Sequence, residues 1–588
     1  AAVFIPVTFI TGPVGVFYKQ FGITLIVAIA ISALNALTLS PVLCALFLKV
    51  DYHDKDGANK NFIQRFFHKF NVGFHATTQR YGGVFPYLSL LKWITAMLFV
   101  VAVGAIFWVN RSMPGGFVPS EDRGIIFANI ELPPGASMER TYQVLKRFED
   151  KAKQLPGVSN VTVSTGRSFF SGSGSNNGLG FVKLAPFDER AGNKDLSVES
   201  ITKKLFGITA GIPEAKGVFF SPASVPGFGN SGGFEMMLLD KAGGDVNEFA
   251  KVSQVFMGKL MERPEIQYAQ SSFNTNYPQY ELDINVAKAQ ESGVTVSNIL
   301  GTMQGYIGGV YAADFTKYGK QFRVMVQALP EDRTDVNSLN KMYVRTASGQ
   351  MTPVTQFVSL KRVYGPPSLS RFNLFSSVKI SGANAEGYST GDAIRAIKET
   401  AASFLPASYG IDFSGLTREE VNAGSQTWVI FVLSLIFVYF ILAAQYESYI
   451  LPLSVILSLP FGVMGAYFGQ WIAGLENNIF FQIALIMLVG LLAKNAILIV
   501  EFAVQRRRHG ESISLSAINA AKARLRPILM TSFAFIFGLI PLVFSTGIGA
   551  TGNRSIATGA ASGLLIGTIL GLIVIPVFYV IFQFLQEK

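Results

Sequence analysis

Residues Ile479–Ala503 read IFFQIALIMLVGLLAKNAILIVEFA and place one cation, Lys494, near the middle of an apolar run. A helix of this length is long enough to cross the roughly 30 Å hydrocarbon core of a bilayer. The side chain of Lys494 is too short to reach either interface easily, and a charge at that depth costs about 3 kcal/mol or more. The segment therefore predicts a membrane-spanning helix whose cation needs an acidic partner or a water-filled cavity.

Helical spacing gives Lys494 a small and polar face that we expect to pack against other helices. This face comprises Gly490, Ala493, Lys494, Ile497 and Glu501. Glu501 is a poor partner because it lies near the predicted cytoplasmic end of the span. No other predicted span carries Asp or Glu near its middle, so the sequence predicts that the partner acid lies upstream of Ala1. A static buried ion pair is the alternative to a functional cation.

The surrounding sequence contains further apolar runs of similar length. Of the 588 residues, 50% are hydrophobic and 15% are charged. In soluble domains about a quarter of the residues are charged. Predicted spans lie near 22–48, 90–109, 425–444, 450–473, 527–545 and 556–584, and 1–11 is expected to be the end of an eighth. Basic residues in 49–89 and 504–526 place both segments on the cytoplasmic side, so residues 110–424 lie outside.

The first cytoplasmic segment contains a predicted amphipathic helix, Asn61–Phe74. Its apolar face carries Phe62, Phe66, Phe67, Phe70 and Phe74. Such a helix either lies on the inner membrane surface or packs against the underside of the protein itself.

An internal repeat links the first pair of apolar runs to the last pair. Pro6, Thr11, Gly12, Lys19 and Pro41 recur as Pro541, Thr546, Gly547, Arg554 and Pro576. Gly559, Gly563, Gly567 and Gly571 follow one helix face and predict close helix packing there, and Thr24, Ala28, Ser32 and Ala36 match them. Both pairs run in the same direction, which indicates a parallel repeat. We therefore expect the full protein to have two repeats, about twelve spans and two external domains.

The external segment alternates between strand and helix patterns. Strands at 125–132, 158–165, 181–184 and 218–221, with helices at 137–154 and 197–208, predict a split βαβ unit. A second unit is interrupted: 234–240, helix 245–262 and 267–273 form one half, and 378–382, helix 390–404 and 411–414 form the other. The inserted segment 274–373 has strands near 279–286 and 321–329 that suggest a mixed sheet.

Residues Gly166–Gly180 read GRSFFSGSGSNNGLG and predict a flexible loop that carries two adjacent aromatic residues, Phe169 and Phe170. These rings could form a mobile apolar gate for ligands or could plug the domain core. No Gly-Lys pair follows the spacing of a Walker A motif, so this chain shows no nucleotide site.

Other functional classes find little support. The four His, at positions 53, 68, 75 and 509, lie in basic loops without ligand spacing, so no metal site is expected. The net charge of +11 does not indicate nucleic acid, because the basic residues cluster beside apolar spans. Arg524 opens the span at 527–545, and Thr531 follows two turns later; this hydroxyl either lines a proton path or bonds to its own helix.

Two motifs resemble signature helices of resistance-nodulation-division (RND) exporters. They are GLLAKNAILIVEFA (Gly490–Ala503) and RLRPILMT (Arg524–Thr531), and the AcrB-like hydrophobe/amphiphile multidrug branch fits best. The resemblance extends over the whole chain, including YVRTASGQMTPV (Tyr343–Val354). It implies a polytopic α-helical membrane protein with a large periplasmic α+β domain of split βαβ, ferredoxin-like subdomains.

The resemblance also implies a function. RND proteins of this branch are not enzymes but homotrimeric proton/drug antiporters of the Gram-negative inner membrane, in contact with membrane lipids. They export small amphiphilic or hydrophobic drugs through a periplasmic adaptor and an outer-membrane channel, and they use protons and no cofactor.

Individual residues match positions of the family. Lys494 matches the lysine that pairs with two aspartates of the fourth span, and Arg524, Thr531 and Asn495 match the rest of the proton relay. Phe169 and Phe170, with Gly166, Gly172 and Gly174, fall in the switch loop between two drug pockets. Phe181 matches a deep-pocket aromatic, Phe219 and Phe220 fall near the entrance cleft, and Thr162 stands where the family has Phe.

The resemblance also implies a division into domains. In the membrane part, 1–48 contains spans five (partial) and six, 49–89 is a cytoplasmic loop, 90–109 is span seven, and 425–588 contains spans eight to twelve with loop 504–526. In the external part, 110–226 is a first porter subdomain, 227–273 with 374–418 is a second, and 274–373 is a docking funnel.

Three alternative functions fit the sequence less well. A heavy-metal RND exporter would need methionine or acidic ladders, and Met236–Met237 is too short a run. A secretion accessory would have six spans and a smaller external domain. A non-transporting scaffold leaves Lys494 unexplained.

Overall fold

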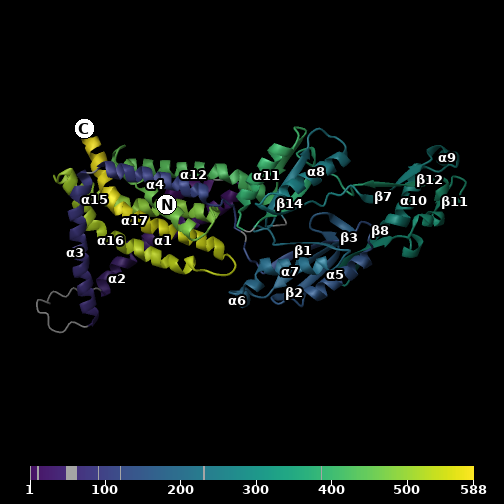
Figure 1. The fold of residues 1–588 in the computed structure, drawn as a ribbon, viewed down its shortest axis with the longest axis horizontal. Coiled ribbons are helices and arrows are strands. Elements are labelled where there is room, and N and C mark those ends of the chain that lie inside the picture. Colours follow the sequence, from purple (N-terminus) through teal and green to yellow (C-terminus); the bar gives the residue numbers. More distant parts are fainter. Residues whose placement is uncertain are drawn as a thin grey trace.

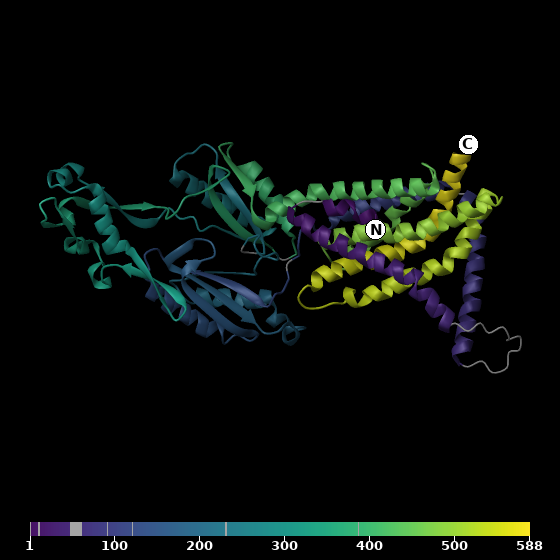
Figure 2. The ribbon, with the colours of Figure 1, turned by 180° about the vertical axis from the view of Figure 1, so that it is seen from behind.

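The computed structural model describes residues 2–9, 12–47, 62–90, 92–119, 121–229, 232–385 and 387–588. The molecule is elongated, with a helical bundle at one end, two sheet subdomains beside each other in the middle and a third subdomain at the far end (Figure 1 and Figure 2). Residues 49–61 of the predicted cytoplasmic loop fall outside the described residues.

The bundle contains the predicted spans as helices. Its elements are α1 (Gly12–Leu37), α2 (Leu39–Phe47), α4 (Lys92–Ser112), α12 (Gly415–Tyr446), α13 (Pro452–Ile456), α14 (Leu459–Ile472), α15 (Ile479–Arg508), α16 (Ile513–Val543) and α17 (Ala550–Glu587). Within the described ranges, six helical segments are long and apolar enough to cross a bilayer, and Phe431–Tyr446 of α12 is a shorter apolar stretch. Six of the predicted spans are thus confirmed as long apolar helices, and the predicted span at 425–444 is apolar over this shorter stretch of its described residues.

The first residues differ from the prediction. Ala2–Phe4 and Pro6–Phe9 form short 3₁₀ turns and not an α-helical run. They pack into the bundle core through Val3, Phe4 and Val7, and Ser434 of α12 donates a hydrogen bond to the carbonyl of Val3 (3.2 Å).

Small residues allow α17 to approach α14 and α15 closely. A Cβ atom at Gly563 would lie 2.5 Å from Cδ2 of Leu488 and 2.9 Å from the carbonyl oxygen of Gly462. Similar contacts occur at Gly559 and Gly567, whereas a Cβ at Gly571 would only approach Ile575 of its own helix at 3.2 Å. The predicted small-residue face is therefore a helix-packing surface over its first three glycines.

Helix α3 (Phe62–Leu90) crosses the end of the bundle that is remote from the sheets (Figure 1). The hydroxyl of Tyr81 donates to the carbonyl of Leu572, and Arg526 lies 5.8 Å from the ring of Phe74. The later part of α3 therefore packs on the underside of the protein. The side chains of Phe62, Phe66 and Phe67, on which the predicted apolar face also depends, lie outside the described part, and Phe70 is exposed.

The first sheet subdomain is a split βαβ unit, as predicted. Its elements are β1 (Ile125–Glu131), α5 (Met138–Ala152), β2 (Val158–Ser168), β3 (Gly172–Leu184), α6 (Phe187–Arg190), α7 (Val198–Ala210) and β4 (Lys216–Phe220). The strands are antiparallel in the order β2-β3-β1-β4. Ser137 caps α5 by accepting a hydrogen bond from the Arg140 amide, and buried side chains of α5 and α7 pack on Ile126 and Ile130 of β1.

The second sheet subdomain repeats this topology from two separated parts of the chain. It contains β5 (Phe234–Asp240), α8 (Val246–Met261), β6 (Ile266–Gln270), β14 (Phe375–Asn384), α11 (Thr390–Phe404) and β15 (Tyr409–Phe413). The order is β6-β14-β5-β15, and β13 (Ser370–Phe372) also pairs with β14. The prediction of an interrupted second unit is confirmed.

The inserted subdomain has the predicted strands but not the predicted mixed sheet. It contains β7 (Tyr277–Ile284) paired with β12 (Val358–Gly365), β8 (Val310–Lys317) with β9 (Lys320–Val326), β10 (Tyr343–Arg345) with β11 (Met351–Pro353), and helices α9 (Val286–Glu291) and α10 (Val296–Met303). Every ladder among its described strands is antiparallel. Strands β8 and β9 are antiparallel because a tight two-residue hairpin turn joins them. The turn residues are Tyr318 (φ 53°) and Gly319 (φ 71°).

The bundle and the second sheet subdomain meet at a hydrogen-bonded junction. The amide of Gly116 donates to the carbonyl of Asn477 (3.2 Å), in the loop that precedes α15. Beside it, Thr390 of α11 donates to Glu420 of α12 (2.7 Å). Burial raises the pKa of Glu420 to about 7, and burial also raises the pKa of Glu476.

Substituting Gly563 by Ala should destabilise the bundle, because the added methyl group overlaps Leu488 and the backbone of Gly462. Overpacking of this kind costs about 1–3 kcal/mol. The control is Gly538→Ala on α16, where nothing lies within 4 Å of the added carbon. Thermal unfolding of the full-length protein in detergent should show a lower melting temperature for Gly563→Ala only; equal melting temperatures would contradict this packing.

Substituting Glu420 by Gln should remove a pH-dependent loss of stability. Because the folded-state pKa is about 7 and the ordinary value is 4.5, the wild type loses stability as the pH rises between these values. The loss is at most about 3 kcal/mol and is complete above the folded pKa. The two proteins should therefore have similar melting temperatures at pH 5, whereas at pH 8 the melting temperature of the wild type should be lower than that of Glu420→Gln. The exposed Glu262→Gln is the control, and a constant difference at both pH values would contradict the assignment.

Candidate functional site

Strand β1 turns three functional side chains away from the helices of its subdomain. Residues along a strand alternate between its faces. Ile126, Ala128 and Ile130 therefore join the core under α5 and α7, as observed. Phe127, Asn129 and Glu131 occupy the opposite face, which looks towards the second sheet subdomain.

The predicted flexible loop Gly166–Gly180 is mostly a β-hairpin. Strands β2 and β3 pair as far as Ser168 and Gly172, which leaves a turn of Phe169, Phe170 and Ser171. Gly166 (φ 85°) sits at a register shift in β2, and Gly172 (φ 79°) closes the turn. The Gly- and Ser-rich composition suggested a loop, but β1 pairs with β3 from Asn177 onwards and supplies backbone partners there. Gly174 lies on β3, where a Cβ would approach Asn177 to 2.8 Å.

The hairpin tip brings the predicted aromatic residues together. The ring of Phe169 stacks on Phe127 with centroids 4.9 Å apart and planes 4° apart. The rings of Phe181 (5.8 Å) and Phe220 (5.5 Å) meet Phe169 edge to face, and Phe170 lies 5.2 Å from Phe220. Phe169 thus fills an aromatic cluster, whereas Phe170 lines the neighbouring cavity. Phe127 was not among the predicted site residues, although its alternation with Asn129 and Glu131 along the strand was a usable signal.

Phe219 does not belong to this cluster, so its predicted place near the entrance cleft is wrong. It is 1% exposed and packs on Phe148 (5.6 Å) and Phe206 (5.0 Å) in the core under the helices. The reason is strand alternation, which points Phe219 and Phe220 to opposite faces of β4. Thr162 lies on β2 directly opposite Phe181.

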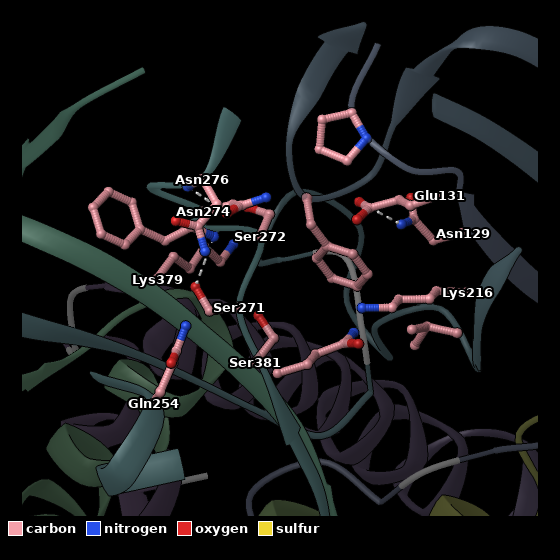
Figure 3. A pocket seen from close by; sticks show the side chains of 15 residues that line it. Asn129, Glu131, Lys216, Gln254, Ser271, Ser272, Asn274, Asn276, Lys379 and Ser381 are labelled. Atoms are coloured by element: carbon pink, nitrogen blue, oxygen red, sulfur yellow. Dashed lines mark hydrogen bonds between the residues drawn. The ribbon is translucent and has the colours of Figure 1, made fainter. Parts of the chain in front are cut away.

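A cleft separates the two sheet subdomains. It consists of two hollows of about 520 and 530 Å³ that share the lining residues Glu131, Pro134, Lys216, Ser272 and Asn274. Figure 3 shows the first hollow with Asn129, Glu131 and Lys216 on one wall. The other wall carries Gln254, Ser271, Ser272, Asn274, Asn276, Lys379 and Ser381. Polar and apolar groups both line the cleft, and the apolar side chains of the first hollow are Pro134, Phe170, Val218 and Phe273.

Charged and unsatisfied groups line this cleft. Lys379 pairs with Glu235 (2.9 Å), while Lys216 has no acidic group within 4 Å among the described residues. Nε2 of Gln270 is buried and has no hydrogen-bond partner in the described structure. A bound polar group could satisfy this donor. These residues form no recognisable sequence pattern, because they come from separate strands and a turn.

Lys494 is the exposed residue in an otherwise covered stretch of α15. Of the residues 481–503 of α15, Lys494 alone is exposed. No described acidic group lies within 4 Å of its ammonium group, and Glu501 instead accepts a hydrogen bond from Gln505 (3.0 Å). Lys494 therefore faces outward from the described bundle without a counter-charge in it.

Asn495 lies in a buried polar network next to Lys494. Its amide donates to Ser532 of α16 (3.2 Å), and Thr568 of α17 also donates to Ser532 (3.0 Å). The network ties three helices together inside the apolar bundle. Ser532 and Thr568 were not predicted as site residues, because isolated hydroxyl residues are common in membrane helices.

The structure does not join Arg524 and Thr531 to Lys494 by hydrogen bonds in its described part. The guanidinium of Arg524 lies 4.6 Å from the ring of Phe502. Thr531 donates to the carbonyl of Ile528 on its own helix (3.1 Å), which is the structural alternative considered above. Within the described ranges, no group of three or more His, Cys, Asp or Glu side chains is arranged to hold a metal ion.

Comparison with known proteins supports the resemblance. Residues 1–583 match the AcrB/AcrD/AcrF family. The multidrug/solvent efflux pump membrane transporter MepB of Pseudomonas putida is 34% identical over 585 residues, which cover 99% of this chain and 55% of MepB. The multidrug resistance protein MdtF of Escherichia coli K12 is 36% identical over 596 residues, which cover 100% of this chain and 56% of MdtF. The chain thus spans about half the length of these relatives. It is a membrane protein that belongs to the AcrB/AcrD/AcrF family.

Proposed function

We propose that the chain forms part of a proton-driven exporter of amphiphilic or hydrophobic compounds in the inner membrane of a Gram-negative bacterium. Its relatives MepB and MdtF are named as multidrug efflux or resistance proteins, and TtgE of Pseudomonas putida, 36% identical over 589 residues, is named as a toluene efflux pump. These names favour drug-like compounds over metal ions as substrates. Protons would be the coupling ion, and no other cofactor is proposed.

The observation that carries this proposal is the placement of Lys494. Between residues 481 and 503 of α15, Lys494 alone is exposed, so its ammonium group is the point in this stretch at which an external acid can reach the helix. A carboxylate paired with Lys494 would hold the adjacent helices in one arrangement. Protonating that carboxylate would remove the attraction, and the helices could then move. We place the acid in the part of the relatives that this chain does not cover.

The cleft between the sheet subdomains supplies a place for the exported compound. It offers the ring of Phe170 to the apolar part of an amphiphilic ligand and many hydrogen-bonding groups to its polar part. The loop before α15 bonds to Gly116, and the neighbouring Gly115 accepts a hydrogen bond from Gly391 of the second of these subdomains. A movement of α15 could therefore change the width of the cleft.

Assembly is part of the proposal. We expect a homotrimer that joins a periplasmic adaptor and an outer-membrane channel, with the inserted subdomain towards the channel. The β8–β9 hairpin supports contact between copies, because it is exposed along its length and presents Tyr311, Phe315, Phe322 and Met325 to its surroundings.

Replacing Lys494 by Met should abolish efflux without reducing the amount of folded protein. The change removes the charge that responds to the proposed acid but keeps an apolar helix. Dye accumulation in cells that express the full-length protein should rise to the level of cells without it. Arg508→Met, at the exposed cytoplasmic end of the same helix, should export normally. Unchanged efflux by Lys494→Met would favour a scaffold that does not transport.

Replacing Phe170 by Ala should weaken binding of the exported compound. Loss of one aromatic contact of about 1 kcal/mol corresponds to a roughly fivefold rise in KM. Initial efflux rates at several dye concentrations give this constant, and Tyr142→Ala, an exposed aromatic residue on α5 outside the cleft, is the control. A KM equal to that of the wild type would place the ligand elsewhere.

A further inference from the structure

We propose that Asn129 and Glu131 are positioning residues that hold the hairpin tip Ser168–Ser171 and so keep Phe170 in the wall of the cleft. This inference rests on the proposed function of the cleft and adds residues that set its geometry. No family position assigned above includes either side chain.

Asn129 binds the first half of the tip. Its Oδ1 accepts hydrogen bonds from the Ser168 hydroxyl (2.8 Å) and from the Phe169 amide (2.9 Å). The side chain is 2% exposed although it lies on the central strand of the sheet. A buried amide on an apolar strand is costly unless it is hydrogen-bonded, and the tip supplies its partners.

Glu131 binds both ends of the tip and also touches Asn129. Its Oε1 accepts from the Asn129 amide (3.1 Å) and the Ser171 hydroxyl (3.0 Å), and it shares the single proton of the Ser168 hydroxyl (3.3 Å) with Oδ1 of Asn129. Figure 3 shows Asn129 and Glu131 side by side at the cleft wall, joined by this first bond. Hydrogen bonds to a charged acceptor are stronger than those between neutral groups.

Ser168 transmits this anchoring to the aromatic residues. Its hydroxyl oxygen accepts from the amides of Phe170 (3.1 Å) and Ser171 (3.1 Å). The backbone of the turn is therefore bound to a side chain that is itself held by Asn129 and Glu131. Phe169 is also held by stacking on Phe127. Together these contacts hold Phe170 at the edge of the first hollow.

Glu131 also connects the tip to the ligand space, because it lines both hollows. A ligand group that bonds to this carboxylate would compete with the two serine hydroxyls. The same residue would then sense occupancy of the cleft and release the hairpin tip.

The first experiment measures mobility of the tip and does not depend on transport. A nitroxide is attached at Ser173→Cys, an exposed position next to the turn, in full-length protein with Cys44→Ser. The electron paramagnetic resonance spectrum of Glu131→Ala should show a more mobile label than the wild type. Glu131→Gln should resemble the wild type, because its amide oxygen accepts from the same hydroxyls. Equal mobility in Glu131→Ala and wild type would overturn the inference.

The second experiment measures KM and maximal rate of dye efflux. Glu131→Ala should raise KM about fivefold with the maximal rate unchanged within about twofold, and Glu131→Gln should restore KM. Ser171→Ala, which removes one hydrogen-bond donor, should give a smaller rise in KM. This variant replaces Glu131→Ala in the experiment if Glu131→Ala folds poorly. Glu139→Ala, an exposed acid on α5, is the control.

The two readouts separate this inference from the proposed function. Absence of efflux by the wild type would contradict the proposed function but leave the mobility result intact. An unchanged KM for Glu131→Ala and Ser171→Ala, or a Glu131→Gln as impaired as Glu131→Ala, would overturn the role of the hydrogen bonds.

Discussion

An ammonium group in the middle of an apolar helix must be neutralised or hydrated, and this requirement governs how α15 is packed. Helices α14, α16 and α17 cover α15, and glycines on α14 and α17 let their backbones approach it closely. Close packing leaves no room for a charged side chain on those faces. Lys494 consequently occupies the one face that the described bundle leaves open.

The same helix is bonded to the external domain at its other end. Asn478 caps α15 by accepting from the Phe481 amide, and its neighbour Asn477 bonds to the segment that leads from α4 into the sheets. The segment in turn accepts a hydrogen bond from Gly391 of α11. We infer that a shift of α15 would act on both sheet subdomains, because this segment enters the first and is bonded to the second. Hydrogen bonds hold the hairpin tip in the cleft wall that the first sheet subdomain forms. Such a shift would therefore change the width of the cleft, and not only the position of the tip.

Much of the fold could be predicted from the sequence, because local patterns determine it. Apolar runs predicted the membrane helices, and the helix expected at 137–154 is α5. The hairpin at 166–180 was not predicted, because its strands are held by pairing with β1 and not by their own Gly- and Ser-rich composition. Phe219 was misplaced because a family position does not say which face of β4 it occupies. The cleft required two subdomains in contact, so residues such as Gln270 and Lys379 carried no local signal.

Proton coupling through Lys494 can be measured as proton flux across a defined membrane. The full-length protein is reconstituted into vesicles that contain a pH-sensitive dye, and a pH gradient is imposed with and without an exported compound outside. The compound should accelerate collapse of the gradient in wild-type vesicles and should have no effect in vesicles with Lys494→Met. Export that proceeds equally without a pH gradient, or equal proton flux in both proteins, would contradict it.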